Sequence, residues 1–136
     1  MSIGVVIVTH YRLGQEFLQA LRLIVPEAPE FHSVSIEPAQ SVDEMRSGIS
    51  AALRAADQGQ GVLVLTDMFG GTPSNISLSF LDEHHVEVVT GFNLPMLIKL
   101  ATLGEEKSLE DLATFIKDYG RRNISVASEL LPEGSS

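Results

Sequence analysis

The sequence predicts an α/β fold with three layers, in which an open and mainly parallel sheet lies between helices. Short apolar runs rich in β-branched residues alternate along the chain with longer amphipathic segments, and this alternation is typical of parallel strands connected by helices. The chain has 136 residues, of which 44% are apolar and 20% charged, so a single domain can bury a full core. No apolar run approaches the roughly 20 residues that a membrane helix requires.

Four strands are expected from short runs rich in valine, isoleucine and leucine. The first and third of these runs are apolar throughout, as in strands buried on both faces, whereas the second alternates apolar and polar residues. In chain order, the expected strands are 3–8, 31–36, 62–65 and 86–90. A short antiparallel strand at residues 124–127 would complete a domain of residues 1–128, and residues 129–136 are expected to form a C-terminal tail.

Five helices are expected, and local signals mark several of their ends. In chain order they are 16–25, 41–59, 73–81, 94–103 and 108–119. Pro26 ends the first helix, because proline cannot continue a helix. Ser41 and Glu44, three residues apart, form a capping box that begins the second. Thr72 is the expected N-cap of the third helix, and Gly104 ends the fourth.

The charge balance and the amino-acid content exclude several classes of function. Nine lysines and arginines stand against eighteen aspartates and glutamates, a net charge of −9, so the basic face of a nucleic-acid-binding protein is missing. The chain contains no cysteine, which excludes disulfides, thiolate metal sites and cysteine nucleophiles. The first residues lack the pattern of a signal peptide. We therefore expect a cytoplasmic protein without a cofactor, a metal or a nucleic-acid partner.

Two of the expected strands end alike. The run VVIV is followed by Thr9 and His10, and the run VLVL is followed by Thr66 and Asp67. If the first and third strands are neighbours, as in the flavodoxin-like strand order, His10 and Asp67 face each other across the crevice where such folds bind ligands. A carboxylate that holds one imidazole nitrogen as N–H leaves the other free as a nucleophile or base. The alternative is that His10 is an ordinary polar residue that closes a strand.

The loop after the third strand, residues 68–75 (MFGGTPSN), is rich in glycine and small polar residues. Gly70 and Gly71 allow backbone N–H groups to converge, since neither has a Cβ atom. Thr72 adds a hydroxyl at the start of a helix, where free N–H groups can bind an anion. The loop is thus a candidate phosphoryl-binding cradle beside His10, although the same residues would also serve a tight strand–helix turn. It contains neither a P-loop nor a GxGxxG pattern, so a nucleotide site is not expected.

A second loop, residues 90–97 (TGFNLPML), follows the fourth strand at the same edge of the sheet. Asn93 is the expected N-cap of the helix that begins there. The apolar residues Phe92, Leu94 and Met96 have two interpretations. At least two of them are expected to pack in the core, and the alternative is a partner-docking rim beside the crevice.

Three segments of the chain resemble one protein family. They are the N-terminal strand that ends in Thr9 and His10, TDMFGGTPSN at 66–75, and GFNLPML at 91–97. Together they resemble the IIA component of the mannose/fructose/sorbose family of the bacterial phosphoenolpyruvate-dependent sugar phosphotransferase system (PTS). The resemblance extends over about residues 1–128, and the glycine-rich block is quite specific to this family.

The resemblance implies a phosphotransferase that acts as a phosphohistidine carrier. His10 would accept a phosphoryl group from phospho-HPr and pass it to a IIB component, for sugar uptake or for regulation. Asp67 would pair with the imidazole, and the hydroxyl of Thr72 would contact the phosphoryl group. Family members are homodimers, in some of which the C-terminal strand crosses to the other subunit. Association with a membrane would come only through transporter partners.

Two other functions fit part of the pattern. The phosphoryl-carrier subunit of a dihydroxyacetone kinase shares the fold and the N-terminal histidine, but the TDMFGGTPSN block argues against it. A non-catalytic module of flavodoxin-like fold would bind an anion or a mononucleotide at residues 70–72. Transfer assays that compare a IIB domain with a dihydroxyacetone kinase subunit as acceptor distinguish the phosphohistidine carrier from the first alternative. Titration with nucleotides distinguishes it from the second.

Overall fold

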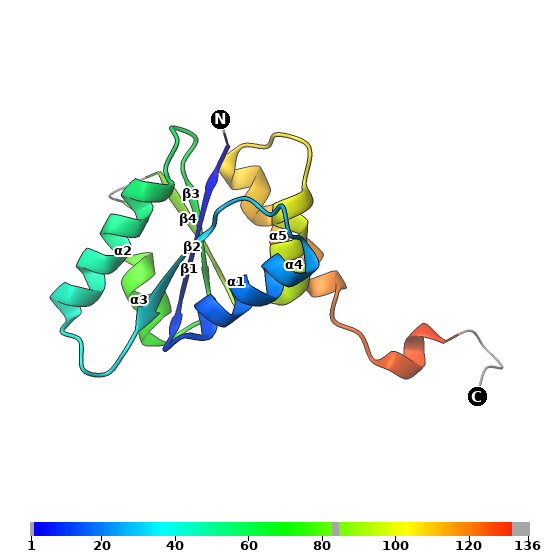
Figure 1. Cartoon of the computed structure of the whole chain (residues 1–136), viewed down its shortest axis with the longest axis horizontal. Coiled ribbons are helices and arrows are strands. Elements are labelled where there is room, and N and C mark those ends of the chain that lie inside the picture. The colour runs from blue at the N-terminus through cyan, green and yellow to red at the C-terminus, as the bar shows by residue number, and fades with distance from the viewer. Residues whose placement is uncertain (1, 83–84, 132–136) are drawn as a thin grey trace.

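Four parallel strands form one sheet in the order β2-β1-β3-β4 (Figure 1). The computed structural model describes residues 2–82 and 85–131. The strands are β1 (Gly4–His10), β2 (His32–Ile36), β3 (Val62–Thr66) and β4 (Val86–Thr90). This order confirms the predicted α/β fold with its flavodoxin-like arrangement of strands. It also brings the carboxyl ends of β1 and β3 together at one edge of the sheet.

Helices cover both faces of the sheet (Figure 1). They are α1 (Leu13–Ile24), α2 (Val42–Ala56), α3 (Thr72–Leu78), α4 (Leu94–Thr102) and α5 (Leu109–Arg122). Alternate residues of β1 point to opposite faces of the sheet. Val5 and Ile7 pack with α1, α4 and α5, whereas Val6 and Val8 pack with α2 and α3. None of the helices in the described part of the chain is long and apolar enough to cross a membrane.

Polar side chains cap three helices, at Ser41 and Asn93 as predicted and also at Ser108. The Glu44 carboxylate accepts a hydrogen bond from the backbone N–H of Ser41 at 2.9 Å, and Ser41 Oγ accepts one from the N–H of Glu44 at 3.1 Å. The backbone N–H of Ser41, and then its hydroxyl, favour the charged carboxylate and lower the pKa of Glu44. This contribution to stability is therefore present at neutral pH and is lost as the pH falls through the folded-state pKa. Asn93 and Ser108 likewise accept an N–H of the first turn of α4 and α5.

The third helix begins one residue earlier than predicted. Gly71, with φ −85° and ψ 170°, is the N-cap of α3, and Thr72 is the first helical residue. The prediction that Thr72 caps this helix is therefore wrong. An extended glycine turns the chain into the helix without a side-chain cap, and the close approach of Gly71 to β1, described below, decides where the turn occurs.

The predicted strand at residues 124–127 is also wrong. After α5 the chain leaves the body of the molecule, and Ala127–Leu130 form a short 3₁₀ helix, η1 (Figure 1). A strand requires hydrogen bonds to a neighbouring strand, and none of the described strands pairs with this segment. Within the predicted tail, residues 132–136 lie outside the described residues.

Candidate functional site

His10 and Asp67 lie side by side at the carboxyl ends of β1 and β3. The two strands are parallel neighbours with Val8 opposite Thr66, so the residues that follow them meet at the same edge. Asp67 Oδ2 lies 2.8 Å from His10 Nδ1 and also accepts a hydrogen bond from the backbone N–H of His10 at 3.0 Å. One carboxylate oxygen thus holds both the ring and the main chain of the histidine.

This contact decides which imidazole nitrogen is free. An ionised carboxylate can only accept hydrogen bonds, so Nδ1 of the neutral ring carries the proton and Nε2 keeps its lone pair. The side chain of Asp67 is 12% exposed and that of His10 is 45% exposed. Nε2 makes no hydrogen bond with any residue that the structure describes. The pair therefore consists of a half-exposed imidazole with one free nitrogen and a largely buried carboxylate that orients it.

Gly71 lies against the side of the imidazole ring that carries the free nitrogen. A Cβ atom at this position would stand 2.8 Å from His10 Cε1 and 3.3 Å from His10 Nε2. Only glycine therefore lets the backbone of the loop pass so close to the ring. Glycine at position 70 is favoured for a different reason, its left-handed φ of +87°. Space does not require it, because nothing lies within 4 Å of the position that its Cβ would take.

Thr72 is exposed at the first position of α3. Its hydroxyl makes no hydrogen bond with the described residues, His10 and Asp67 included, so it is available to an incoming group. The N–H groups in the first turn of a helix have no partner within the helix. The loop therefore offers both a free hydroxyl and free N–H groups next to the residue that touches the ring.

Replacing Gly71 by alanine is expected to slow any reaction at His10 by about 10²-fold, because a displacement of about 1 Å at a reacting atom has an effect of that size. The ring cannot move aside without breaking its hydrogen bond to Asp67. The measurement is the rate of the reaction that the resemblance implies for His10, phosphoryl transfer to the variant. Gly104→Ala is the matched control, since nothing lies within 4 Å of its Cβ position. Equal rates for Gly71→Ala and the wild-type chain would contradict a role for this close approach.

Two features of the turn after β1 escape sequence analysis. The fully buried hydroxyl of Thr9 accepts a hydrogen bond from the N–H of Gly14 at 2.8 Å and donates one to the carbonyl of Tyr11 at 3.4 Å. Thr9 thus fixes the turn that presents His10, a role that the Thr–His pair at a strand end could have indicated. Tyr11 has a φ of +49°, and no sequence signal predicts a tyrosine in that conformation.

The second loop does not form a rim beside the site. Phe92 and Met96 are 7% and 3% exposed and belong to the core on the α1 face, against which Leu94 also packs. This confirms the prediction that at least two of these residues pack in the core. Apolar side chains are instead exposed next to the site at Tyr11 and, in the loop that contains the glycines, at Met68 and Phe69.

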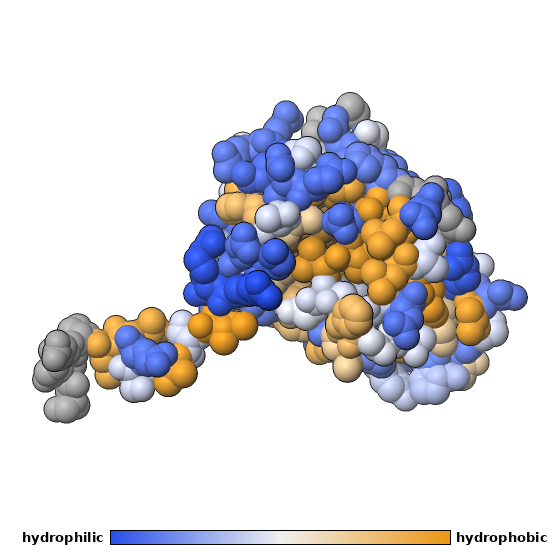
Figure 2. Space-filling view, turned by 180° about the vertical axis from the view of Figure 1, so that it is seen from behind, coloured by the Kyte–Doolittle hydropathy of each residue, from blue (hydrophilic) through white to orange (hydrophobic). Residues whose placement is uncertain are grey.

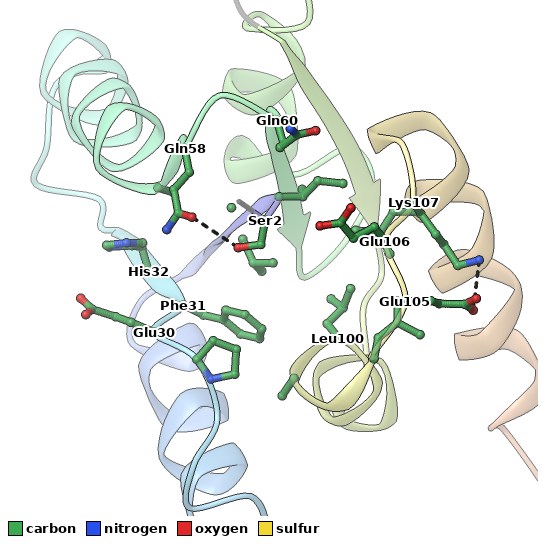
Figure 3. A pocket seen from close by; sticks show the side chains of 18 of the residues that line it. Ser2, Glu30, Phe31, His32, Gln58, Gln60, Leu100, Glu105, Glu106 and Lys107 are labelled. Atoms are coloured by element: carbon green, nitrogen blue, oxygen red, sulfur yellow. Dashed lines mark hydrogen bonds and ion pairs between the residues drawn. The ribbon is translucent and has the colours of Figure 1, made fainter.

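A cavity of about 790 Å³ lies at the opposite end of the sheet, near the amino ends of β1 and β2 (Figure 3). Polar groups at its wall pair with each other: Ser2 Oγ donates to Gln58 Oε1 at 3.4 Å, and Lys107 Nζ lies 3.4 Å from Glu105 Oε1. None of the residues of the candidate site lines this cavity. The chemistry at the carboxyl edge of the sheet is therefore independent of it.

Comparisons with known proteins agree on one family. The sequence profile of the EIIA-man family, described as PTS system fructose IIA component, matches residues 4–117. The fructose-specific EIIA component of Bacillus subtilis (strain 168) is 28% identical over 130 residues, which cover 95% of this chain and 89% of that protein. The mannose-specific EIIAB component of Escherichia coli (strain K12) is 29% identical over 126 residues, or 91% of this chain. The chain spans 39% of the length of that protein.

A solved structure agrees with the fold. The mannose/sorbose specific IIA subunit of the phosphotransferase system from Enterococcus faecalis superposes with a TM-score of 0.86 and 28% identity. The superposition covers 99% of this chain and 100% of the other. The similarity therefore includes the strands and the loops that carry the candidate site.

Proposed function

Since this chain belongs to the family of PTS fructose-type IIA components, which carry phosphoryl groups in sugar phosphotransferase systems, we propose that His10 is its phosphoryl acceptor. Phospho-HPr is the donor and a IIB component is the acceptor, for sugar uptake or regulation. The observation that supports this assignment is the contact of Asp67 Oδ2 with His10 Nδ1, which leaves Nε2 free in a half-exposed ring. The family match favours this function over a dihydroxyacetone kinase subunit or a nucleotide-binding module.

The reaction is an exchange of one nitrogen–phosphorus bond for another. The lone pair of His10 Nε2 attacks the phosphorus of the donor's phosphohistidine, and the electron pair of the breaking bond returns to the donor's imidazole. Asp67 keeps the proton on Nδ1 and stabilises the positive charge that the ring gains. Transfer to a IIB component repeats the exchange with His10 as the donor. Such a transfer depends on positioning and on charge stabilisation, and no cofactor takes part.

The phosphoryl oxygens require hydrogen-bond donors. We assign this role to the hydroxyl of Thr72 and to the backbone N–H groups of Gly70, Gly71 and Thr72. The approach of Gly71 to the edge of the His10 ring supports the assignment, because it brings this stretch of backbone next to Nε2. Gly70 allows the turn through its positive φ.

A transfer assay tests the proposed function. The chain is incubated with labelled phosphoenolpyruvate, the general phosphotransferase enzyme and HPr, and its label is tested for acid lability. An acid-labile label that peptide mapping places on His10 is the expected result, and addition of a IIB domain should remove it. A chain that stays unlabelled with an active donor contradicts the proposal. We expect the reaction to take place in the cytoplasm, with contact to a membrane only through transporter partners.

We also propose that two copies of the chain associate through the segment that follows α5. Residues 123–131 lead away from the body, and Ile124, Val126 and Leu130 are 75%, 60% and 71% exposed. Figure 2 shows apolar side chains along this segment and a separate apolar area on the face of the body. Among the described strands β4 pairs only with β3, and a cavity of about 560 Å³ along β4 is lined by Val88 among others. In a dimer, the exposed apolar segment of each copy can therefore pack along the open β4 edge of the other copy.

Replacing both Ile124 and Val126 by aspartate is expected to convert a dimer into a monomer, because two charges would enter the apolar contact. Light scattering after size exclusion measures the mass against the 14.7 kDa of one chain. Leu23→Asp, at an 84% exposed position on α1, is the control and should remain dimeric. A dimeric double variant would show that the association uses another surface.

A further inference from the structure

Tyr11 holds a backbone conformation that tyrosine rarely adopts. Its φ of +49° lies in the left-handed region, and it is the one non-glycine residue with a positive φ among residues 2–82 and 85–131. The Cβ atom of an L-residue crowds the backbone in this region, so glycine and asparagine are the usual occupants. Backbone outliers of this kind cluster at active sites and ligand clamps, so the strain beside His10 points to a role in function.

The side chain of Tyr11 does little for the fold. It is 57% exposed and makes no hydrogen bond, ion pair or ring contact with the described residues. The hydrogen bonds of the turn use only its backbone: its N–H donates to the carbonyl of Ile36 at 2.9 Å, and its carbonyl accepts from Thr9 Oγ1 at 3.4 Å. Glycine at position 11 would keep both bonds and remove the crowding.

The position of Tyr11 points to a contact between proteins. It directly follows His10, and a second exposed aromatic side chain, Phe69, belongs to the loop that passes along the His10 ring. A donor protein must bring its phosphohistidine within bonding distance of Nε2 and will therefore cover the surface around it. Exposed aromatic side chains are enriched among the residues that dominate protein–protein binding.

We propose that Tyr11 is a recognition residue, whose side chain contacts the phosphohistidine-bearing donor protein when that protein docks at His10. The proposal rests on the proposed function of His10, and it gives the strained turn at Tyr11 a role in binding the donor protein. The strain is retained because glycine, which suits the backbone, would leave no side chain for this contact.

The test compares two phosphoryl donors on the variant Tyr11→Gly. Phospho-HPr must dock, whereas phosphoramidate is a small donor whose nitrogen–phosphorus bond breaks with loss of ammonia and which needs no docking surface. We expect the rate with limiting phospho-HPr to fall on the order of tenfold, the effect of losing a dominant interface residue. The rate with phosphoramidate should stay within about twofold, and the unfolding temperature should be unchanged or higher. Tyr11→Phe, which keeps the aromatic ring, should react with phospho-HPr nearly as fast as the wild-type chain.

Three results would overturn the inference, and each has a different meaning. An unchanged rate of Tyr11→Gly with phospho-HPr would show that the side chain makes no useful contact. Equal losses with both donors would show that Tyr11 positions His10 itself. Failure of the wild-type chain with both donors would overturn the proposed function of His10 and, with it, this inference. Tyr11→Asn provides a second variant, because asparagine also tolerates a left-handed backbone.

Discussion

The variant His10→Ala should accept no phosphoryl group from phospho-HPr and should still fold. Alanine lacks the Nε2 lone pair, and no other described histidine shares the contact with Asp67. The side chain of His10 is 45% exposed at the end of β1, so its removal takes little apolar surface out of the core. Asp67 keeps its hydrogen bond from the backbone N–H at position 10. We expect a loss of stability of about 1–3 kcal/mol, from the ring hydrogen bond that Asp67 loses.

The assay with labelled phosphoenolpyruvate measures this loss, and urea unfolding measures the stability. His85→Ala is the matched control, because His85 is an exposed histidine that lies 3.6 Å from Glu110, away from the proposed site. This control should be labelled like the wild-type chain. Label on His10→Ala would assign the phosphoryl group to another residue.

The variant Asp67→Asn should lose about 10²- to 10⁴-fold in transfer rate, the range expected when a carboxylate that orients a reactive histidine becomes an amide. The Asp67 oxygen that contacts Nδ1 also accepts the backbone N–H of His10. An asparagine that turns its NH₂ group toward Nδ1 donates where the carboxylate accepted, so the ring proton moves to Nε2 and the nucleophilic lone pair is lost. An asparagine that keeps its oxygen there holds the tautomer but cannot neutralise the charge that the ring gains.

Rates of transfer from phospho-HPr, measured at several donor concentrations, test this prediction. We expect the maximal rate to fall more than the apparent affinity, because Asp67 is largely buried beneath the ring and does not reach a docked donor. Asp118→Asn is the control, an exposed aspartate paired with Lys117 at 3.7 Å on α5. A maximal rate within threefold of the wild-type value would show that another group orients the imidazole.

Much of this architecture follows from local patterns. The strands are short runs that are apolar or alternate apolar and polar residues, and the caps at Ser41, Asn93 and Ser108 lie within three residues of the N–H groups that they bind. Both signals depend on neighbours along the chain, so they can be recognised without the tertiary structure. Parallel strands that alternate with helices then require His10 and Asp67 to meet once β1 and β3 are neighbours.

The tertiary structure alone decided the features that depend on contacts between distant segments. Gly71 lies close to the His10 ring because the loop after β3 folds back over the end of β1. No local sequence pattern predicts this close approach. The left-handed turn at Tyr11 opposes the local preference of tyrosine, since β1, β2 and the Thr9 hydroxyl fix the chain on either side of it. Residues 124–127 have the composition of a strand, but they follow α5 out of the body and pair with none of the described strands. Sequence therefore predicted which residues carry the proposed chemistry, and packing determined how closely the backbone approaches them and which side chains remain exposed.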